Sequence, residues 1–127
     1  MEVATPVKIA IVDDDDSVRE SLFGLVESVG YDVTVFRSAE QFLGLKHSDQ
    51  FACLILDVRL PGMSGVELYS HLRKNQQWVP TVFITAYADG ATQSKALAQG
   101  AEAFLYKPFK PEALLDSLRS AVAKWKV

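Results

Sequence analysis

The stretch Phe51-Ala-Cys-Leu-Ile-Leu-Asp57 decides how this chain is organised. Six apolar residues lead into one carboxylate, and Val58-Arg-Leu-Pro-Gly62 then turns the chain. A short apolar run that ends at a Pro-Gly turn is typical of a strand covered on both faces, as in parallel sheets. Asp57 would then lie at the carboxyl end of the strand, where open α/β sheets bind their ligands. On this segment alone, the more common explanation is an aspartate that simply begins the turn.

Other apolar runs repeat this pattern along the chain. The runs and the polar residues that follow them are residues 7–12 before Asp13, residues 81–84 before Thr85, and residues 103–106 before Lys107. Residues 31–36 instead alternate apolar and polar side chains, which is typical of a strand at the edge of a sheet. Between the runs, apolar residues recur at helical spacing. Five strands and five helices are therefore expected.

Residues at the expected helix starts support this assignment. Ser17, Ser38 and Ser64 each precede a Glu or Gln by three residues, the spacing of a capping box. Asp89 is placed to cap the fourth helix, and Pro111 suits the first turn of the last one.

Alternation of strands and helices predicts a parallel α/β sheet with helices on both faces. Right-handed crossovers, with residues 31–36 at the edge, favour a flavodoxin-like (βα)5 three-layer sandwich whose five-stranded sheet has the order 2-1-3-4-5. At 127 residues, the chain is expected to form a single domain over residues 1–127, with its core at about residues 7–125.

Composition excludes several classes of function. The formal charge of −3 provides no global basic field, so no direct contact with nucleic acid is expected. No apolar run is long enough to span a membrane, and Met1-Glu-Val3 does not begin a signal peptide. The one cysteine, Cys53, lies inside an apolar run, which favours a buried, reduced thiol. A cytoplasmic protein without a membrane partner is expected.

The strand ends carry the chemistry. In a parallel sheet, Asp13, Asp14, Asp57, Thr85 and Lys107 would meet at one edge and share one crevice. Clustered carboxylates repel one another unless a cation neutralises them, and oxygen ligands without His or Cys favour Mg²⁺. A carboxylate that faces Mg²⁺, an ammonium and a hydroxyl is equipped to attack a phosphoryl group.

Four motifs in this order resemble the receiver domain of two-component response regulators, over about residues 7–125. The motifs are Ile11-Val-Asp-Asp14, Leu56-Asp-Val-Arg-Leu-Pro-Gly62, Ile84-Thr-Ala86 and Tyr106-Lys-Pro-Phe109. Residues 13–22 resemble the FixJ-type receivers most.

The resemblance implies a role for each site residue. Asp57 would be the phosphoacceptor and a metal ligand, Asp14 would bind Mg²⁺ directly, and Asp13 would act on the ion through water. The backbone carbonyl of Arg59 would complete the protein ligands. The phosphoryl oxygens would be contacted by Thr85 and Lys107, and the Lys107-Pro108 bond would be cis.

The resemblance also implies a signalling switch. A sensor histidine kinase or phosphotransfer protein would supply the phosphoryl group, and water would later hydrolyse the aspartyl phosphate. Thr85 and Phe104 would form the switch. The surface of residues 88–99, Phe104 and the last helix would then bind a partner or form a phosphorylation-dependent dimer. Arg59 and Tyr87 would tune the phosphoryl lifetime. The chain would be either a free-standing receiver or part of a longer regulator.

Three other classes compete with this interpretation. An aspartate-nucleophile phosphatase needs a second acid two residues after its nucleophile, where this chain has Arg59. A flavin carrier needs a hydroxyl-rich phosphate loop after the first strand, where four aspartates would repel phosphate. A docking module that is never phosphorylated would not need intact Asp57, Thr85 and Lys107. A phosphorylation assay distinguishes such a module from a receiver that is phosphorylated.

Overall fold

The structure, a computed structural model, describes residues 7–45, 50–87 and 89–125. The expected domain of residues 1–127 extends beyond these ranges, and the expected partner surface begins at Ala88, which also lies outside them. The chain alternates strands and helices in the order β1 (Lys8–Val12), α1 (Asp16–Ser28), β2 (Asp32–Phe36), α2 (Ala39–Leu43), β3 (Cys53–Asp57), α3 (Gly65–Lys74), β4 (Thr81–Thr85), α4 (Gly90–Ala98), β5 (Ala103–Tyr106) and α5 (Pro111–Trp125).

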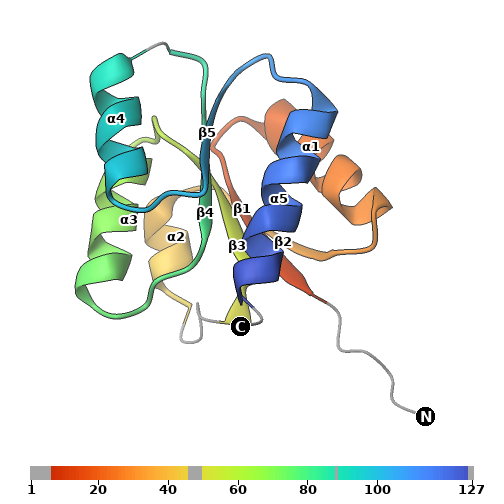
Figure 1. The fold of residues 1–127 in the computed structure, drawn as a ribbon, viewed down its shortest axis with the longest axis horizontal. Coiled ribbons are helices and arrows are strands. Elements are labelled where there is room, and N and C mark those ends of the chain that lie inside the picture. Colours follow the sequence, from red (N-terminus) through yellow and green to blue (C-terminus); the bar gives the residue numbers. More distant parts are fainter. Residues whose placement is uncertain (1–6, 46–49, 88, 126–127) are drawn as a thin grey trace.

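The strands form one parallel sheet in the order β2-β1-β3-β4-β5, so the predicted topology is confirmed (Figure 1). Helices α1 and α5 cover one face, and α2, α3 and α4 cover the other. Side chains of a strand alternate between the two faces. In β1, Ile9 and Ile11 pack with α1 and α5, whereas Ala10 and Val12 pack on the opposite side.

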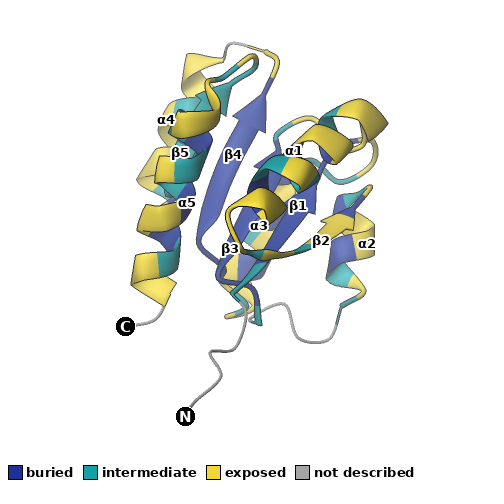
Figure 2. Ribbon diagram, turned by 90° about the vertical axis from the view of Figure 1, so that its right-hand side faces the viewer, coloured by how far each residue is buried: buried dark blue, intermediate teal, exposed yellow. Residues whose placement is uncertain are grey.

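Burial follows the expected pattern. All five residues of both β3 and β4 are buried, because these strands lie inside the sheet and helices cover both faces (Figure 2). The edge strand β2 is largely exposed, as its alternating sequence indicates. Cys53 is buried within β3, as expected for a core thiol. Among the described residues, no helix is both long and apolar enough to cross a membrane.

The predicted helix caps are confirmed at most starts. Ser64 and Glu67 form the full capping box at the start of α3. Ser38 caps α2 by accepting from the Gln41 N–H, but the Gln41 side chain accepts from the preceding residue, Arg37. Helix α4 is capped by Asp89, and α5 begins at Pro111, both as predicted.

The capping box predicted at Ser17 is wrong. Helix α1 begins at Asp16, and its N-cap is Asp15, whose carboxylate accepts from the Val18 N–H at 3.1 Å. The Asp15 N–H in turn donates to Asp13 Oδ1 at 2.9 Å, which fixes the turn. A carboxylate at the positive end of the helix dipole is favoured over a neutral hydroxyl, so the helix starts earlier than predicted.

The topology brings the strand ends together. Asp57 is the last residue of β3 and Thr85 the last of β4, while Asp13 follows β1 and Lys107 follows β5. Register aligns Val12 with Leu56 and Asp57 with Ile84, so these ends lie at one level of the sheet. The polar residues therefore converge at one edge.

Gly65 provides a test of how tightly this edge is packed. A Cβ at this buried first residue of α3 would collide with the backbone carbonyl oxygen of Asp57. We expect Gly65→Ala to lower the free energy of unfolding by about 1–3 kcal/mol or more. Gly24→Ala is the matched control, because a Cβ there would meet no atom within 4 Å apart from its chain neighbours and the nearby backbone of α1 itself. It should stabilise the protein by about 0.5–1 kcal/mol.

Urea denaturation of both variants measures the two effects. Equal stability of Gly65→Ala and wild type would show that α3 can move away from the end of β3 without cost.

Candidate functional site

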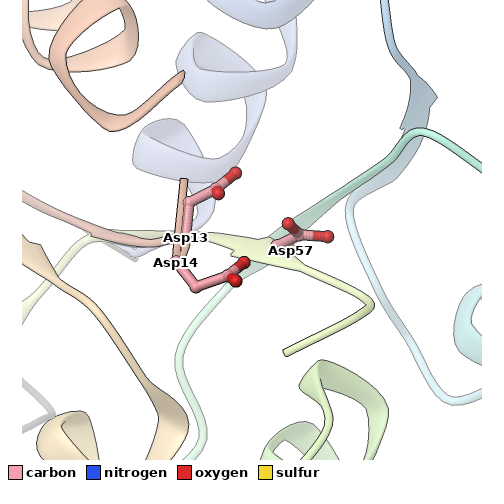
Figure 3. Close-up of side chains that lie close together, drawn as sticks. All are labelled: Asp13, Asp14 and Asp57. Carbon is pink, nitrogen blue, oxygen red and sulfur yellow. The ribbon is translucent and has the colours of Figure 1, made fainter. Parts of the chain in front are cut away.

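Three carboxylates lie together at the carboxyl edge of the sheet. Oxygen atoms of Asp13, Asp14 and Asp57 all lie within 4.8 Å of one another (Figure 3). Asp13 is fully buried and Asp57 is 6% exposed, whereas Asp14 is exposed. The predicted acidic cluster is therefore present, with two of its members removed from most contact with water.

Lys107 bridges the two buried carboxylates. Its Nζ atom lies 3.0 Å from Asp13 Oδ2 and 3.3 Å from Asp57 Oδ2. Burial lowers the pKa of Lys107, but the hydrogen bond and the charge of Asp13, with the charge of Asp57, more than offset this and raise it. The ammonium therefore stays protonated between the two carboxylates.

The acidity of Asp57 reflects its crowded surroundings. Burial and the nearby charge of Asp13 raise its pKa from 3.8 to about 6, although Lys107 and the Arg59 N–H act in the opposite direction. The Arg59 N–H donates to Asp57 Oδ1 at 3.1 Å. The net upward shift means that Lys107 and this hydrogen bond do not fully offset burial and the charge of Asp13.

This donor set fits a divalent cation. The cluster offers carboxylate oxygens without nitrogen or sulfur ligands, which is the chemistry preferred by Mg²⁺. The charge of Asp13 is, after burial, the second cause of the raised pKa of Asp57, and a bound cation would relieve this repulsion. Asp13, Asp14 and Asp57 can therefore hold such an ion, and the role of the Arg59 carbonyl stays a prediction.

A cavity of about 550 Å³ opens over the acidic cluster. Its lining consists of Asp14, Asp15, Asp16, Ser17, Asp57, Arg59, Ala86, Tyr87 and Lys107. The Arg59 guanidinium lies 4.1 Å from the centre of the Tyr87 ring, a cation–π contact. Arg59 and Tyr87, the two residues expected to tune the phosphoryl lifetime, thus stack on each other in the wall of the cavity.

Thr85 lies at the end of β4, but its hydroxyl is engaged outside the acidic cluster. Its Oγ1 accepts from the Tyr87 N–H at 3.1 Å, and the residue is buried. It also lines a separate cavity of about 460 Å³ together with Phe104. Within the described residues, the structure thus brings together Asp13, Asp14, Asp57 and Lys107, with Thr85 beside them.

Phe104 is 8% exposed and belongs to a chain of aromatic rings. Its centroid lies 6.0 Å from that of Phe83 and 5.5 Å from that of Tyr106. The Tyr106 hydroxyl donates to the Gln93 side chain in α4 at 2.6 Å. The Phe104 ring is thus in the inward position, with little of it exposed to solvent. The Lys107-Pro108 bond is cis, as the resemblance implied.

The sequence analysis missed two residues that hold backbone segments following β1 and β3. The Arg19 guanidinium donates to the Asp13 carbonyl oxygen at 2.9 Å, inside the fold. Glu40 accepts from the Met63 N–H at 2.8 Å, and this hydrogen bond is the main reason that its pKa is lowered. Arg19 could have been noticed as a charge on the same helical face as Leu22, whereas the partner of Glu40 lies too far along the chain.

Known proteins share this sequence and fold. The sequence profile described as "Response regulator receiver domain" matches residues 9–119. Nodulation protein W of Bradyrhizobium diazoefficiens is 39% identical over 123 residues, which cover 97% of this chain and 54% of that protein. Transcriptional regulatory protein FixJ of the same organism is 35% identical over 120 residues, covering 94% and 58%. The structure of response regulator StyR has a TM-score of 0.89 and 41% identity, covering 96% of this chain and 62% of that one.

The chain spans about half the length of the curated relatives it matches. The similarity to FixJ agrees with the resemblance found in residues 13–22 and extends it along most of the sequence.

The pKa of Asp57 predicts how stability depends on pH in metal-free buffer. The folded carboxyl binds a proton near pH 6, whereas the value for an unperturbed group is 3.8. Its ionisation therefore destabilises the fold above pH 6, and this penalty disappears as the pH falls through 6 towards 4. Asp57→Asn should be more stable than wild type at pH 7.5, by about 1–2 kcal/mol after allowance for solvent screening.

Denaturation with EDTA between pH 4 and 8 measures this difference. It should shrink towards low pH, whereas Asp116→Asn on α5 should show no comparable trend. A difference that stays constant over this range would contradict the proposed electrostatic origin.

Proposed function

Because this chain belongs to the family of response regulator receiver domains, we propose that it is a switch in which Asp57 accepts a phosphoryl group from a partner's phosphohistidine. The observation that carries the proposal is the position of Asp57. Its buried carboxylate lies at a strand end with the Lys107 ammonium 3.3 Å away and two further carboxylates beside it. We also propose that residues 1–127 form one receiver domain.

In the proposed reaction, a carboxylate oxygen of Asp57 attacks phosphorus while the P–N bond of the phosphohistidine breaks. The histidine nitrogen keeps the electron pair of that bond, and Asp57 becomes an acyl phosphate. Water later hydrolyses the acyl phosphate, which releases inorganic phosphate and restores the carboxylate. The chain is thus a signalling module whose chemistry acts on itself.

The other residues around the cavity over the acidic cluster (the cleft) have separate proposed roles. Lys107 already lies within hydrogen-bond distance of Asp57, so it can donate to the oxygens of an arriving phosphoryl group. Asp13, Asp14, Asp57 and the carbonyl of Arg59 would hold Mg²⁺. When bound, Mg²⁺ would neutralise the clustered carboxylates and stabilise negative charge on the transferring group.

The partner proposal is supported by a mainly apolar groove next to the cleft. This groove, about 560 Å³ in volume, is lined by Ser17, Val18, Ser21, Leu22, Leu25, Ala86, Lys107, Pro108, Phe109 and Pro111. Ser17, Ala86 and Lys107 line the acidic cavity as well, so the groove leads to Asp57. We propose that a sensor histidine kinase or phosphotransfer protein rests here while its phosphohistidine reaches the carboxylate.

The output is proposed to pass through Thr85 and Phe104. The Thr85 hydroxyl would leave the Tyr87 N–H and bond to the phosphoryl oxygens. The ring of Phe104 is already inward in this structure, so phosphorylation would stabilise that position against an exposed one. The surface formed by α4, β5 and α5 would bind an output domain, a partner or a second copy (Figure 1).

Asp57→Asn tests the acceptor. The variant keeps the shape of the side chain but has no nucleophilic carboxylate, so acetyl phosphate with Mg²⁺ should add no phosphoryl group. Wild type and Asp15→Asn should each gain one, because Asn is an equally good N-cap and Asp15 only lines the cavity. Intact-mass measurement gives the result.

EDTA should abolish the labelling of wild type. Unchanged labelling of Asp57→Asn would assign the acceptor to another residue, and equal labelling with EDTA would exclude a metal requirement.

Thr85→Ala tests the coupling to the output surface. Beryllofluoride with Mg²⁺ mimics the phosphoryl group and should shift amide NMR signals of α4 and β5 in wild type. In Thr85→Ala, the shifts should stay near Asp57, because no hydroxyl links the phosphoryl group to Phe104. Ser94→Ala, an exposed position in α4, serves as the control and should respond like wild type. Equal shifts in Thr85→Ala and wild type would disprove the coupling.

A further inference from the structure

Arg19 is a charged side chain on the buried face of α1. The buried residues of this helix are Arg19, Leu22 and Val26, which follow one another at helical spacing. The exposed fraction of Arg19 is only 9%. A guanidinium withdrawn from water is unfavourable unless its donors find partners, so its contacts indicate what it is for.

The guanidinium of Arg19 joins the two ends of the loop of residues 13–16. Nη1 donates to the backbone carbonyl oxygen of Asp13 at 2.9 Å, and this hydrogen bond is buried. Nη2 forms an ion pair with the carboxylate of Asp16, and this contact lowers the pKa of Asp16. The planar fork of donors suits such a double contact better than a lysine ammonium does.

These contacts complete the restraint on Asp13. Its backbone N–H donates to the Phe36 carbonyl at 3.1 Å, and its carbonyl accepts from Arg19. Its carboxylate accepts from the Asp15 N–H and from Lys107. The Asp13 carbonyl belongs to the same planar peptide as the Asp14 nitrogen, so fixing this carbonyl also restricts the direction of the Asp14 side chain.

Arg19 cannot act on a phosphoryl group directly. It is absent from the lining of the cavity over the acidic cluster, and its donors point at the loop. It also brings a positive charge to a loop with four carboxylates, without occupying the cleft. Any effect on phosphotransfer must therefore pass through the position of the loop.

We propose that Arg19 is a positioning residue: it holds the loop of residues 13–16 in the conformation in which Asp13 and Asp14 converge with Asp57. It thereby sets the affinity of the cleft for a divalent cation. This inference rests on the proposed function, since it assigns Arg19 to the metal-dependent step at Asp57.

Three variants separate this role from general stability. Arg19→Met keeps much of the length and packing but has no donors. Arg19→Lys keeps the positive charge, but a single ammonium replaces the planar guanidinium and its two sets of N–H donors. Arg119→Met is the matched control, because Arg119 forms the same i,i+3 ion pair with Asp116 on α5, away from the loop. Leu118→Ala, a core truncation in α5, controls for lost stability.

Mg²⁺ titration followed by the amide NMR signals of Asp13, Asp14 and Arg59 measures affinity without any phosphoryl donor. Arg19→Met should bind Mg²⁺ more weakly than wild type by a factor of about 10 or more. The Mg²⁺ affinity of Arg19→Lys should lie between those of wild type and Arg19→Met. Arg119→Met and Leu118→Ala should bind like wild type. Labelling by acetyl phosphate should be slow in Arg19→Met at low Mg²⁺ and recover at saturating Mg²⁺.

Wild-type Mg²⁺ affinity in Arg19→Met would overturn the inference. So would an equal loss of affinity in Leu118→Ala, which would show that lost stability alone explains the effect. If Arg19→Met does not fold, wild-type affinity in Arg19→Lys overturns the inference, and weakened affinity supports it. If wild type is labelled on Asp57 and the Arg19 variants bind Mg²⁺ and become labelled as wild type does, only the role of Arg19 is refuted. Wild type that neither binds Mg²⁺ nor becomes labelled would refute the proposed function as well.

Discussion

The structure depends on holding like charges together at one edge of a sheet. Parallel strands present their carboxyl ends on the same side, and here those ends carry Asp13, Asp14 and Asp57. Lys107 lies between the two buried carboxylates, and Arg19 holds the loop from behind. Burial and, after it, the charge of Asp13 raise the pKa of Asp57. Three clustered carboxylates that face one ammonium are suited to bind a cation and to react with an electrophilic phosphorus.

The fold and most of the site could be predicted because each depends on local sequence. Apolar runs of strand length mark β1, β3, β4 and β5, and the alternating pattern of β2 places it at the edge. Once the sheet is parallel, its geometry alone brings Asp57 and Lys107 to one crevice. The resemblance to receiver domains added the roles of individual residues, and the comparisons confirm that family.

What the sequence did not reveal depends on the three-dimensional path of the backbone, whether the contacting residues are near or far along the chain. Four successive aspartates can all cap a helix, and the choice of Asp15 depends on the turn that Asp13 makes with it. The charge of Arg19 on a buried face was visible, but its partner is a backbone carbonyl that the sequence does not mark. Glu40 reaches Met63 only because α2 packs beside the loop that follows β3. The hydroxyl of Thr85 contacts the backbone of Tyr87, from whose N–H it accepts, and the sequence does not mark this contact either.

Helix α4 buries few of its own side chains, and within this fully described helix Ala96 is the only buried residue. Its position is otherwise fixed by two hydrogen bonds from other elements, one from the Tyr106 hydroxyl to the Gln93 side chain and one from the Tyr69 hydroxyl to the Gln99 carbonyl. Exposed positions tolerate substitution at little cost in stability. After gene duplication, the outward residues of α4 can therefore diverge while the proposed phosphorylation site stays intact. Such divergence would let sister regulators acquire different partners and keep their signals separate.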